Sequence, residues 1–310
     1  MTASNERSHN PDPPVMKLTM PAFFTNMAPV KLRVAIFISI ASGLALMFAV
    51  DSVWKEGFVF AALGAAVVAV AMAELATLAT KAGVLANRAF LVLVGVGLFL
   101  LQWAGWAWPR YFPDPWLSGA AVPVLTIMGL LMCRVVRGQI TGSLEGVAVT
   151  AAAVLYVPLL LGFLLAIRMQ WGITAVIVVL AVTKAGTSGA YIVGKSIGRT
   201  PLAPSVSPRK TVEGAVGQIA ASIAVGYLLA LPTWGLMHPT AGLFYGLLAG
   251  LTGMFGDLAE SILKRQAGLK DSSQLLPAQG GVLDTIDDVL FVAPVSYFFL
   301  LWCAPLFGAG

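Results

Sequence analysis

The sequence predicts an all-α, polytopic integral membrane protein, and two observations support this prediction. The first is composition: the 310 residues are 58% hydrophobic and only 11% charged, and the mean hydropathy is +0.87. A soluble domain carries about 25% charged residues, so this chain has too few charges to cover a water-facing surface. The second is that the charges are clustered between long uncharged stretches, as in proteins whose charge is confined to loops. A soluble enzyme and a nucleic-acid-binding module are therefore excluded as descriptions of the whole chain.

Nine segments of the chain are apolar enough to be membrane-spanning helices, which need about 20 such residues. In order, they are residues 34–50, 58–73, 89–108, 117–133, 147–167, 172–193, 215–231, 241–256 and 288–307. Gly and Ala are frequent in these segments, which favours close packing of helices. The same feature is compatible with a homodimer.

The distribution of Lys and Arg predicts a cytoplasmic N-terminus and a C-terminus on the outside. In that orientation 15 basic residues fall inside and only Lys55, Arg110 and Arg168 fall outside, as the positive-inside rule requires. We expect a disordered cytoplasmic tail, a set of N-terminal transmembrane helices, and a C-terminal transmembrane catalytic region with two cytoplasmic loops. The respective boundaries are residues 1–30, 31–145 and 146–310, with the loops at 194–214 and 257–288.

Acidic residues concentrate in the second of these loops and at its edges. Six of the 14 in the chain lie there: Asp257, Glu260, Asp271, Asp284, Asp287 and Asp288. Carboxylates at a membrane boundary cost free energy unless they are paired or bind a cation. Mg²⁺ suits such oxygen ligands, because it binds through one or two carboxylates together with substrate phosphates. The loop therefore favours a metal–phosphate site, although a solvated loop whose basic residues only set the orientation remains an alternative.

Basic and glycine residues in the same loop also suit a phosphate ligand. Lys264, Arg265 and Lys270 are interleaved with the acids, and the backbone at Gly280-Gly281 can approach a ligand closely. In the first loop, residues 207–211 (Ser-Pro-Arg-Lys-Thr) precede a predicted span. They resemble a helix start that presents amides, hydroxyls and cations to an anion.

Four further charged residues have structural and functional interpretations that the sequence leaves open. Glu213 is either a ligand-binding residue or a first-turn partner of the helix dipole, and Asp288 is either a site residue or a helix cap. Glu74 is a carboxylate inside the second span, so it is either a polar packing residue or, as intramembrane carboxylates are by default, a functional candidate. We expect Lys184 to pair with one of the acids or to extend towards the membrane boundary.

Taken in order, these motifs resemble the signature of the phosphatidate cytidylyltransferase (CDP-diacylglycerol synthase) family. The second loop matches, with every spacing kept, at Ser261, Lys264, Arg265, Lys270, Asp271, Pro277, Gly280, Gly281, Asp284 and Asp287. The first loop matches at Gly189-Ala190-Tyr191, at Gly194-Lys195 and from Ser207 to Gly214. Three positions depart from the pattern: Gln279 stands where the family usually has His, Thr285 where it has Arg, and Thr187 where it has Asp.

The resemblance implies transfer of CMP from CTP to phosphatidic acid, giving CDP-diacylglycerol and pyrophosphate. It implies a bacterial-type inner membrane with the site facing the cytoplasm, and no nucleic-acid partner. It also implies a set of roles: Mg²⁺ held by Asp257 and Asp284; catalytic roles for Lys264, Arg265, Lys270, Asp284 and Asp287; and substrate binding by Ser207, Lys210, Thr211, Glu213, Ser261, Asp271, Gly280 and Gly281. Because of Gln279 and Thr285, two alternatives stay open: a different lipid phosphate as acceptor, and a non-catalytic membrane scaffold.

Overall fold

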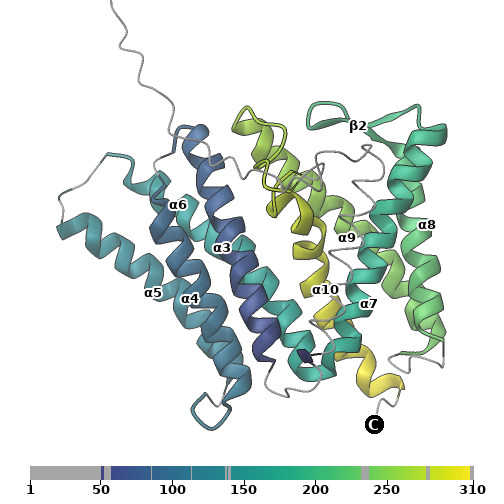
Figure 1. Ribbon diagram of the computed structural model, residues 1–310, viewed down its shortest axis with the longest axis horizontal. Coiled ribbons are helices and arrows are strands. Elements are labelled where there is room, and N and C mark those ends of the chain that lie inside the picture. Colours follow the sequence, from purple (N-terminus) through teal and green to yellow (C-terminus); the bar gives the residue numbers. More distant parts are fainter. Residues whose placement is uncertain are drawn as a thin grey trace, which may run out of the picture.

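The protein is a bundle of long helices with one small hairpin (Figure 1). The computed structural model describes residues 50–51, 57–84, 86–112, 114–136, 138, 141–231, 237–276 and 280–307. The all-α fold class is confirmed, since the structure is 80% helical. In chain order the elements are α3 (Phe58–Lys81), α4 (Arg88–Ala107), α5 (Pro115–Val136), α6 (Ser143–Val154), the π-helix η1 (Leu155–Leu159), α7 (Leu160–Ile197), β1 (Pro201–Ala203), β2 (Ser207–Thr211), α8 (Val212–Leu229), α9 (Pro239–Gln266) and α10 (Leu283–Phe307).

Among the residues that the structure describes, six helical segments are long and apolar enough to cross a membrane, consistent with an integral membrane protein. One of them, Ser143–Ile197, joins α6, η1 and α7 and contains two of the nine predicted spans, 147–167 and 172–193. The helix breaks between these spans at Gly172, where φ is 81° and ψ is −177°, a conformation that is essentially restricted to glycine. The predicted tail and nearly all of the first predicted span lie outside the described residues. The count of nine and the orientation stay predictions.

The two predicted loops are shorter than the sequence indicated, because the helices continue beyond their apolar segments. Helix α9 runs to Gln266 and α10 begins at Leu283, so the predicted loop 257–288 is helical at both ends. In the other loop, α7 extends to Ile197 and α8 begins at Val212. Hydropathy detects only the apolar part of a helix, whereas Leu, Lys, Arg and Gln continue a helix readily into a polar environment.

Between α7 and α8 the chain forms an antiparallel hairpin that the sequence did not predict. Strands β1 and β2 pair Pro201 with Thr211 and Ala203 with Ser207. Residues 207–211, interpreted from sequence as a helix start, are therefore a strand whose last residue caps the next helix. Thr211 is the N-cap of α8, and its Oγ1 accepts a hydrogen bond from the Gly214 N–H at 3.1 Å.

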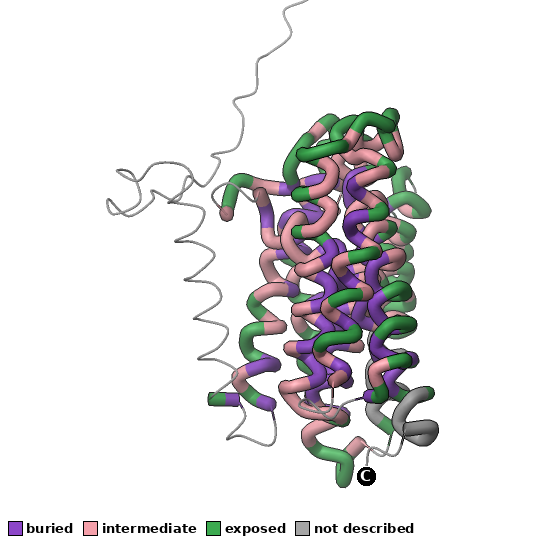
Figure 2. Tube along the Cα trace, turned by 90° about the vertical axis from the view of Figure 1, so that its right-hand side faces the viewer, coloured by how far each residue is buried: buried purple, intermediate pink, exposed green. Residues whose placement is uncertain are grey.

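The buried residues form a continuous core through the middle of the bundle, and the exposed ones lie on its outer faces and ends (Figure 2). The core draws on α3, α4, η1, α7, α9 and α10, and its completely buried side chains include Leu91, Phe99, Val176 and Leu290. This core places the start of α10 against both α9 and the N-terminal helices.

Glycines set the distances between neighbouring helices. A Cβ at Gly226 of α8 would lie 2.5 Å from the carbonyl oxygen of Gly242 in α9, and a Cβ at Gly256 of α9 would lie 2.5 Å from that of Asp287 in α10. No side chain fits at such separations, so the backbones touch directly. The frequent glycine in the spans thus has a role within the chain, and the homodimer stays a prediction.

Glu74 of α3 connects the N-terminal helices to the start of α10. Its side chain is buried, with the residue 6% exposed. The carboxylate accepts hydrogen bonds from the hydroxyls of Ser272 (3.2 Å) and Ser273 (2.6 Å) and from the N–H groups of Val282 (3.0 Å) and Leu283 (2.7 Å). The first N–H groups of a helix have no acceptor within it, and a negative charge is favourable there. Glu74 is therefore a cap for α10 supplied by another helix.

Replacing Gly256 by alanine is expected to destabilise the protein, because the new Cβ meets a backbone atom that cannot move without displacing α10. We expect a loss of about 1–3 kcal/mol, the usual cost of overpacking. Thermal unfolding of the purified protein in detergent measures the effect. Gly97→Ala in α4 is the matched control, since a Cβ there has nothing within 4 Å. Equal behaviour of the two variants would contradict the proposed contact.

Replacing Glu74 by glutamine is also expected to destabilise the protein, by about 2–4 kcal/mol. The variant keeps one acceptor oxygen, but its NH₂ group would face the N–H of Val282 or of Leu283, which can only donate. Glu145→Gln is the control, because Glu145 is an exposed carboxylate in the first turn of α6; its effect should stay within about 0.5 kcal/mol. A Glu74 variant as stable as this control would show that the cap contributes nothing.

Candidate functional site

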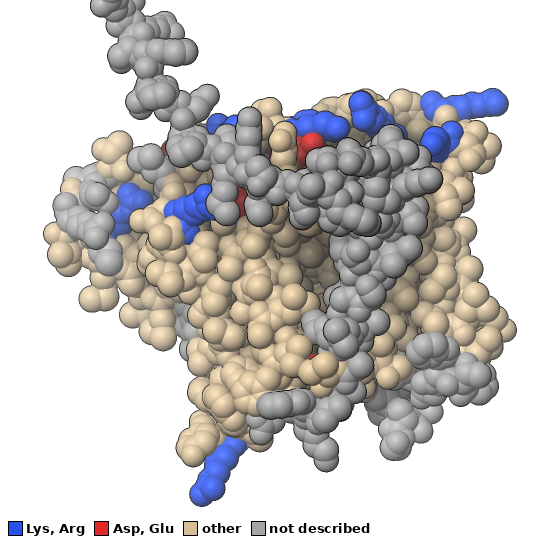
Figure 3. Space-filling model, viewed as in Figure 1, with Lys and Arg blue, Asp and Glu red and all other residues tan. Residues whose placement is uncertain are grey.

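Residues of both predicted loops lie at one end of the bundle, where the hairpin, the end of α9 and the start of α10 meet (Figure 1). Lys and Arg side chains gather along the same edge of the molecule, with acidic side chains among them (Figure 3). On the face shown, most of the visible basic side chains thus lie along the edge that carries residues of the two predicted loops.

Helical spacing aligns the charged residues of α9. Asp257, Glu260 and Lys264 follow one another at intervals of three and four residues, so they share one face of the helix. Asp287 of α10 lies within electrostatic reach of Asp257 and Glu260. It is 6% exposed, and its Oδ1 accepts the N–H of Asp288 at 2.7 Å. The acids of α9 and α10 thus form one cluster.

Lys264 lies between two carboxylates in this cluster. Its Nζ is 2.6 Å from Oδ1 of Asp284 and contacts Oε2 of Glu260, one turn earlier on α9. Glu260 is completely buried, and no described residue donates a hydrogen bond to its Oε1. A buried acceptor without a partner costs free energy, so this carboxylate can accept a further cation or donor.

Asp284 is held in place by groups from the preceding segment. Its Oδ2 accepts the N–H of Ser272 (2.8 Å), the hydroxyl of Ser272 (2.7 Å) and the N–H of Gly281 (2.7 Å). Gly280 has φ of 96°, and a Cβ there would lie 2.8 Å from the same oxygen. In this structure Gly280 and Gly281 thus allow the backbone to lie against the carboxylate of Asp284, where the Gly281 N–H binds it.

The hairpin is attached to α9 by two contacts. Lys210 of β2 pairs with Asp257 through Nζ and Oδ2, 2.6 Å apart. Arg265 donates from Nε to the carbonyl oxygen of Val206 and from Nη1 to that of Leu269, both at 3.1 Å. The two motif segments that the sequence singled out are therefore brought together, as expected for a shared site.

Other predicted site residues have structural partners or lie apart. The carboxylate of Glu213 accepts the N–H groups of Arg199 (3.1 Å) and Thr200 (3.2 Å), which fastens the segment after α7 to the start of α8. Ser207 lies in β2 opposite Ala203, Ser261 is buried on α9, and Lys270 and Asp271 are exposed after α9. Pro277 and Gln279 lie outside the described residues.

A second polar network connects α7 to α10, and sequence reasoning predicted only part of it. Lys184 pairs with Asp288 as expected, through Nζ and Oδ1 at 2.7 Å, and donates to the carbonyl oxygen of Thr285 at 2.7 Å. Thr187 donates from Oγ1 to Oδ2 of Asp288 at 2.8 Å. Because α10 begins at Leu283, the interpretation of Asp288 as a helix cap is wrong. Two of the three departures from the family pattern, Thr187 and Thr285, belong to this network.

The described carboxylates do not form a metal site by themselves, since no group of three His, Cys, Asp or Glu residues among them could hold a metal ion. Mg²⁺ needs fewer protein ligands when phosphate oxygens complete its coordination. Among the described residues, Asp257 is bonded only through Oδ2, and Oδ1 of Asp284 has Lys264 as its single partner. Each carboxylate retains acceptor capacity, so the pair fits a cation that binds together with a phosphate ligand.

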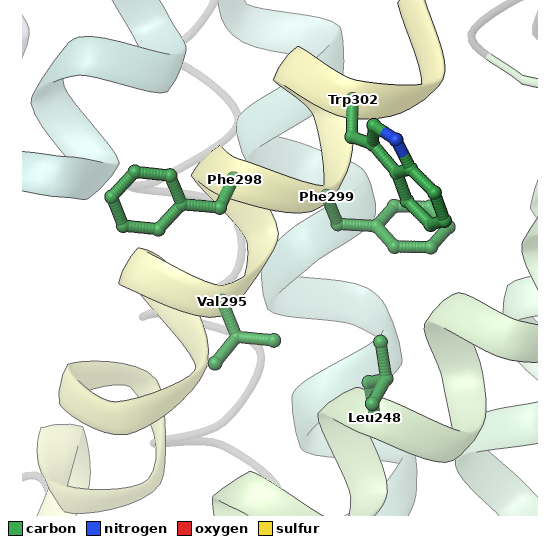
Figure 4. A pocket seen from close by; sticks show the side chains of 5 residues that line it. All are labelled: Leu248, Val295, Phe298, Phe299 and Trp302. Carbon is green, nitrogen blue, oxygen red and sulfur yellow. The ribbon is translucent and has the colours of Figure 1, made fainter. Parts of the chain in front are cut away.

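An apolar pocket lies farther along α9 and α10, away from the charged end. Figure 4 shows its lining: Leu248, Val295, Phe298, Phe299 and Trp302. None of these side chains is charged, so the pocket belongs to the apolar part of the bundle and brings no acid or base to the site.

Comparison with known proteins agrees with the resemblance of the motifs. Residues 31–303 match the sequence model of the Cytidylyltransferase family. A phosphatidate cytidylyltransferase of Synechocystis sp. is 44% identical over 138 residues, which are 44% of this chain and 46% of that protein. The uncharacterised protein YnbB of Escherichia coli is 40% identical over 136 residues, 44% of this chain and 45% of that protein. A phosphatidate cytidylyltransferase of Helicobacter pylori is 33% identical over 226 residues, 70% of this chain and 79% of that protein.

The matches thus span less than half the length of the Synechocystis and Escherichia coli relatives. The match to the family model, in contrast, covers most of this chain. The match includes all six helical segments that are long and apolar enough to cross a membrane, apart from the end of α10. The chain belongs to the cytidylyltransferase family.

Proposed function

We propose that this protein transfers CMP from CTP to phosphatidic acid, giving CDP-diacylglycerol and pyrophosphate. The observation that carries the proposal is the pairing of Lys210 with Asp257 and of Lys264 with Asp284, where the hairpin, α9 and α10 meet. These pairs place cations for a triphosphate beside carboxylates that suit a metal ion. The names of the Synechocystis and Helicobacter relatives support the same activity.

The proposed reaction needs alignment and charge neutralisation more than acid–base chemistry. An oxygen of the lipid phosphate forms a bond to the α-phosphorus of CTP, and the bond from that phosphorus to the bridging oxygen of pyrophosphate breaks. The attacking phosphate is already an anion at neutral pH, so no general base is required. Two mutually repelling anions must instead be held together while charge develops on the leaving pyrophosphate.

The basic residues of the site supply this neutralisation. Without substrate, Lys210 and Lys264 are paired with carboxylates, so incoming phosphates must compete for their N–H groups. Arg265 keeps the hairpin on α9, and exposed Lys270 is free to contact phosphates from the rim. We propose that binding CTP exchanges carboxylate partners for phosphate partners at both lysines.

Mg²⁺ is part of the proposal, with Asp257 and Asp284 as its ligands and Asp287 as a supporting acid. When bound, the ion would neutralise charge on the phosphate oxygens. Its entry would satisfy acceptor capacity that the carboxylate cluster leaves unused, including Oε1 of Glu260. The proposed location is a bacterial-type inner membrane, with this end of the bundle facing the cytoplasm.

A second candidate is a CTP-dependent cytidylyltransferase for another lipid phosphate. The network of Lys184, Thr187 and Asp288 favours it, since Thr187 replaces an acid of the family pattern. Competition between phosphatidic acid and other lipid phosphates for labelled CTP distinguishes the two candidates.

Asp284→Asn is expected to reduce turnover by about 100-fold. The amide removes the carboxylate charge, and its NH₂ group would face either the ammonium group of Lys264 or the N–H groups of Ser272 and Gly281. Radiolabelled CTP with phosphatidic acid and Mg²⁺ measures formation of the lipid-linked CMP product. Glu145→Gln is the control for carboxylate loss away from the site and should keep wild-type activity. Full activity of a folded Asp284→Asn protein would refute the assignment. No lipid-linked product from the wild type, with any lipid phosphate tested, would refute the proposed function.

Chelation of divalent cations is expected to abolish product formation, and added Mg²⁺ is expected to restore it. In Asp257→Asn the Mg²⁺ concentration for half-maximal rate should rise about tenfold or more, in line with losses at altered metal sites. Turnover that is unaffected by chelation would exclude the metal.

A further inference from the structure

We propose that Lys184 binds the phosphate of the lipid acceptor and so helps to determine which acceptor is used. This inference rests on the proposed function and deepens it. It concerns Lys184 on α7, which contacts the start of α10 at Thr285 and Asp288.

Lys184 is the more exposed partner in its ion pair with Asp288. The lysine side chain is 44% exposed, whereas that of Asp288 is only 4% exposed. Asp288 also accepts the hydroxyl of Thr187 and the N–H of Val289, so its charge is compensated from three directions. The pair therefore presents a cation, rather than a carboxylate, to whatever occupies the adjoining space.

The ammonium group of Lys184 has donor capacity left for a ligand. Two of its three N–H groups have acceptors among the described residues, the carboxylate of Asp288 and the carbonyl oxygen of Thr285, both at 2.7 Å. These bonds also fix the position of Nζ, so little side-chain freedom is lost when a ligand binds. A preorganised cation of this kind suits a phosphate monoester.

The position of Lys184 along α7 favours a lipid over a nucleotide as the source of that phosphate. The residue lies within Ser143–Ile197, a segment long and apolar enough to cross a membrane, about 20 Å before its end at Ile197. An ionisable residue within such a segment is a functional candidate by default. A lipid can approach it laterally from the membrane, whereas a triphosphate in water first meets Lys210, Arg265 and Lys270 at the end of the bundle.

A polar stripe on α7 extends from Lys184 towards the charged end. Thr187, Tyr191 and Lys195 follow at intervals of three and four residues, and all three are exposed. Lys195 is 5.4 Å from the centre of the Tyr191 ring and donates to its hydroxyl at 3.3 Å. A lipid phosphate can therefore interact with polar groups along α7. At Lys184 it is also close to the acidic cluster, since Asp287 is within electrostatic reach of Lys184.

The test is a measurement of KM for both substrates with the full chain in mixed micelles of detergent and phosphatidic acid. Lys184→Met should raise the KM for phosphatidic acid about tenfold or more and leave the KM for CTP within about twofold. Lys184→Arg should stay close to the wild type, because the charge is kept. Lys81→Met, at the exposed end of α3, is the control and should change neither KM.

A double variant separates phosphate binding from simple neutralisation of Asp288. Lys184→Met with Asp288→Asn removes both charges and so avoids an unpaired buried carboxylate. If Lys184 binds the lipid, the double variant should fold and still have the raised KM for phosphatidic acid. A return of that KM to the wild-type value would overturn the proposal, as would an equal change in both KM values.

A binding readout keeps this inference separate from the proposed function. Native mass spectrometry compares retention of phosphatidic acid with that of phosphatidylcholine by the wild type and by Lys184→Met. Selective retention that is lost in the variant supports the lipid-phosphate role even if the wild type makes no CDP-lipid. Equal retention by both proteins would overturn it.

Discussion

The geometry of the charged end depends on one buried carboxylate, that of Glu74. It supplies the acceptors that the first N–H groups of α10 lack, and it holds the serines that precede that helix. Asp284 follows Leu283, whose N–H is bonded to Glu74. The Asp284 carboxylate accepts the N–H groups of Ser272 and Gly281, which lie in the segment before α10. A carboxylate from α3 therefore positions Asp284, the acid of α10 that we propose as a metal ligand. Through this connection the N-terminal helices contribute to the geometry of the candidate site, although the family motifs lie in the C-terminal half.

The acids of the site are expensive in an apolar bundle, and the structure offsets that cost by pairing. Lys210 is paired with Asp257, Lys264 with both Asp284 and Glu260, and Lys184 with Asp288. Three lysines face four carboxylates in these pairs, so most of the acidic charge is compensated before substrate arrives. Removing one partner of such a pair would leave an uncompensated charge, so binding of a phosphate requires an exchange of partners at the lysines.

The departures from the family pattern are connected in space. Thr187 and Thr285 lie on different helices and are both bonded to the Lys184–Asp288 pair, Thr187 through its hydroxyl and Thr285 through its backbone carbonyl. One acid and one base of the pattern are thus replaced by neutral hydroxyls, so the formal charge of this wall of the site is unchanged, but Lys184 and Asp288 become its charged pair. This different arrangement of charge is consistent with an altered acceptor preference, whereas the cations near the hairpin are kept.

The sequence by itself determined the membrane class, the approximate positions of the apolar helices and the two segments of the candidate site, because composition, apolar length and motif spacing are local properties of the chain. For Lys184 it offered two interpretations, pairing with an acid or extending towards the membrane boundary, of which the structure shows the pairing. Only the tertiary structure decided which acid that was, that Glu74 caps α10, and that residues 207–211 form a strand. Helix ends were misplaced because hydropathy ends where the apolar residues end, whereas the helix continues. The choice of partner for a charge depends on which helices the glycines allow to touch, and no pattern within one segment contains that information.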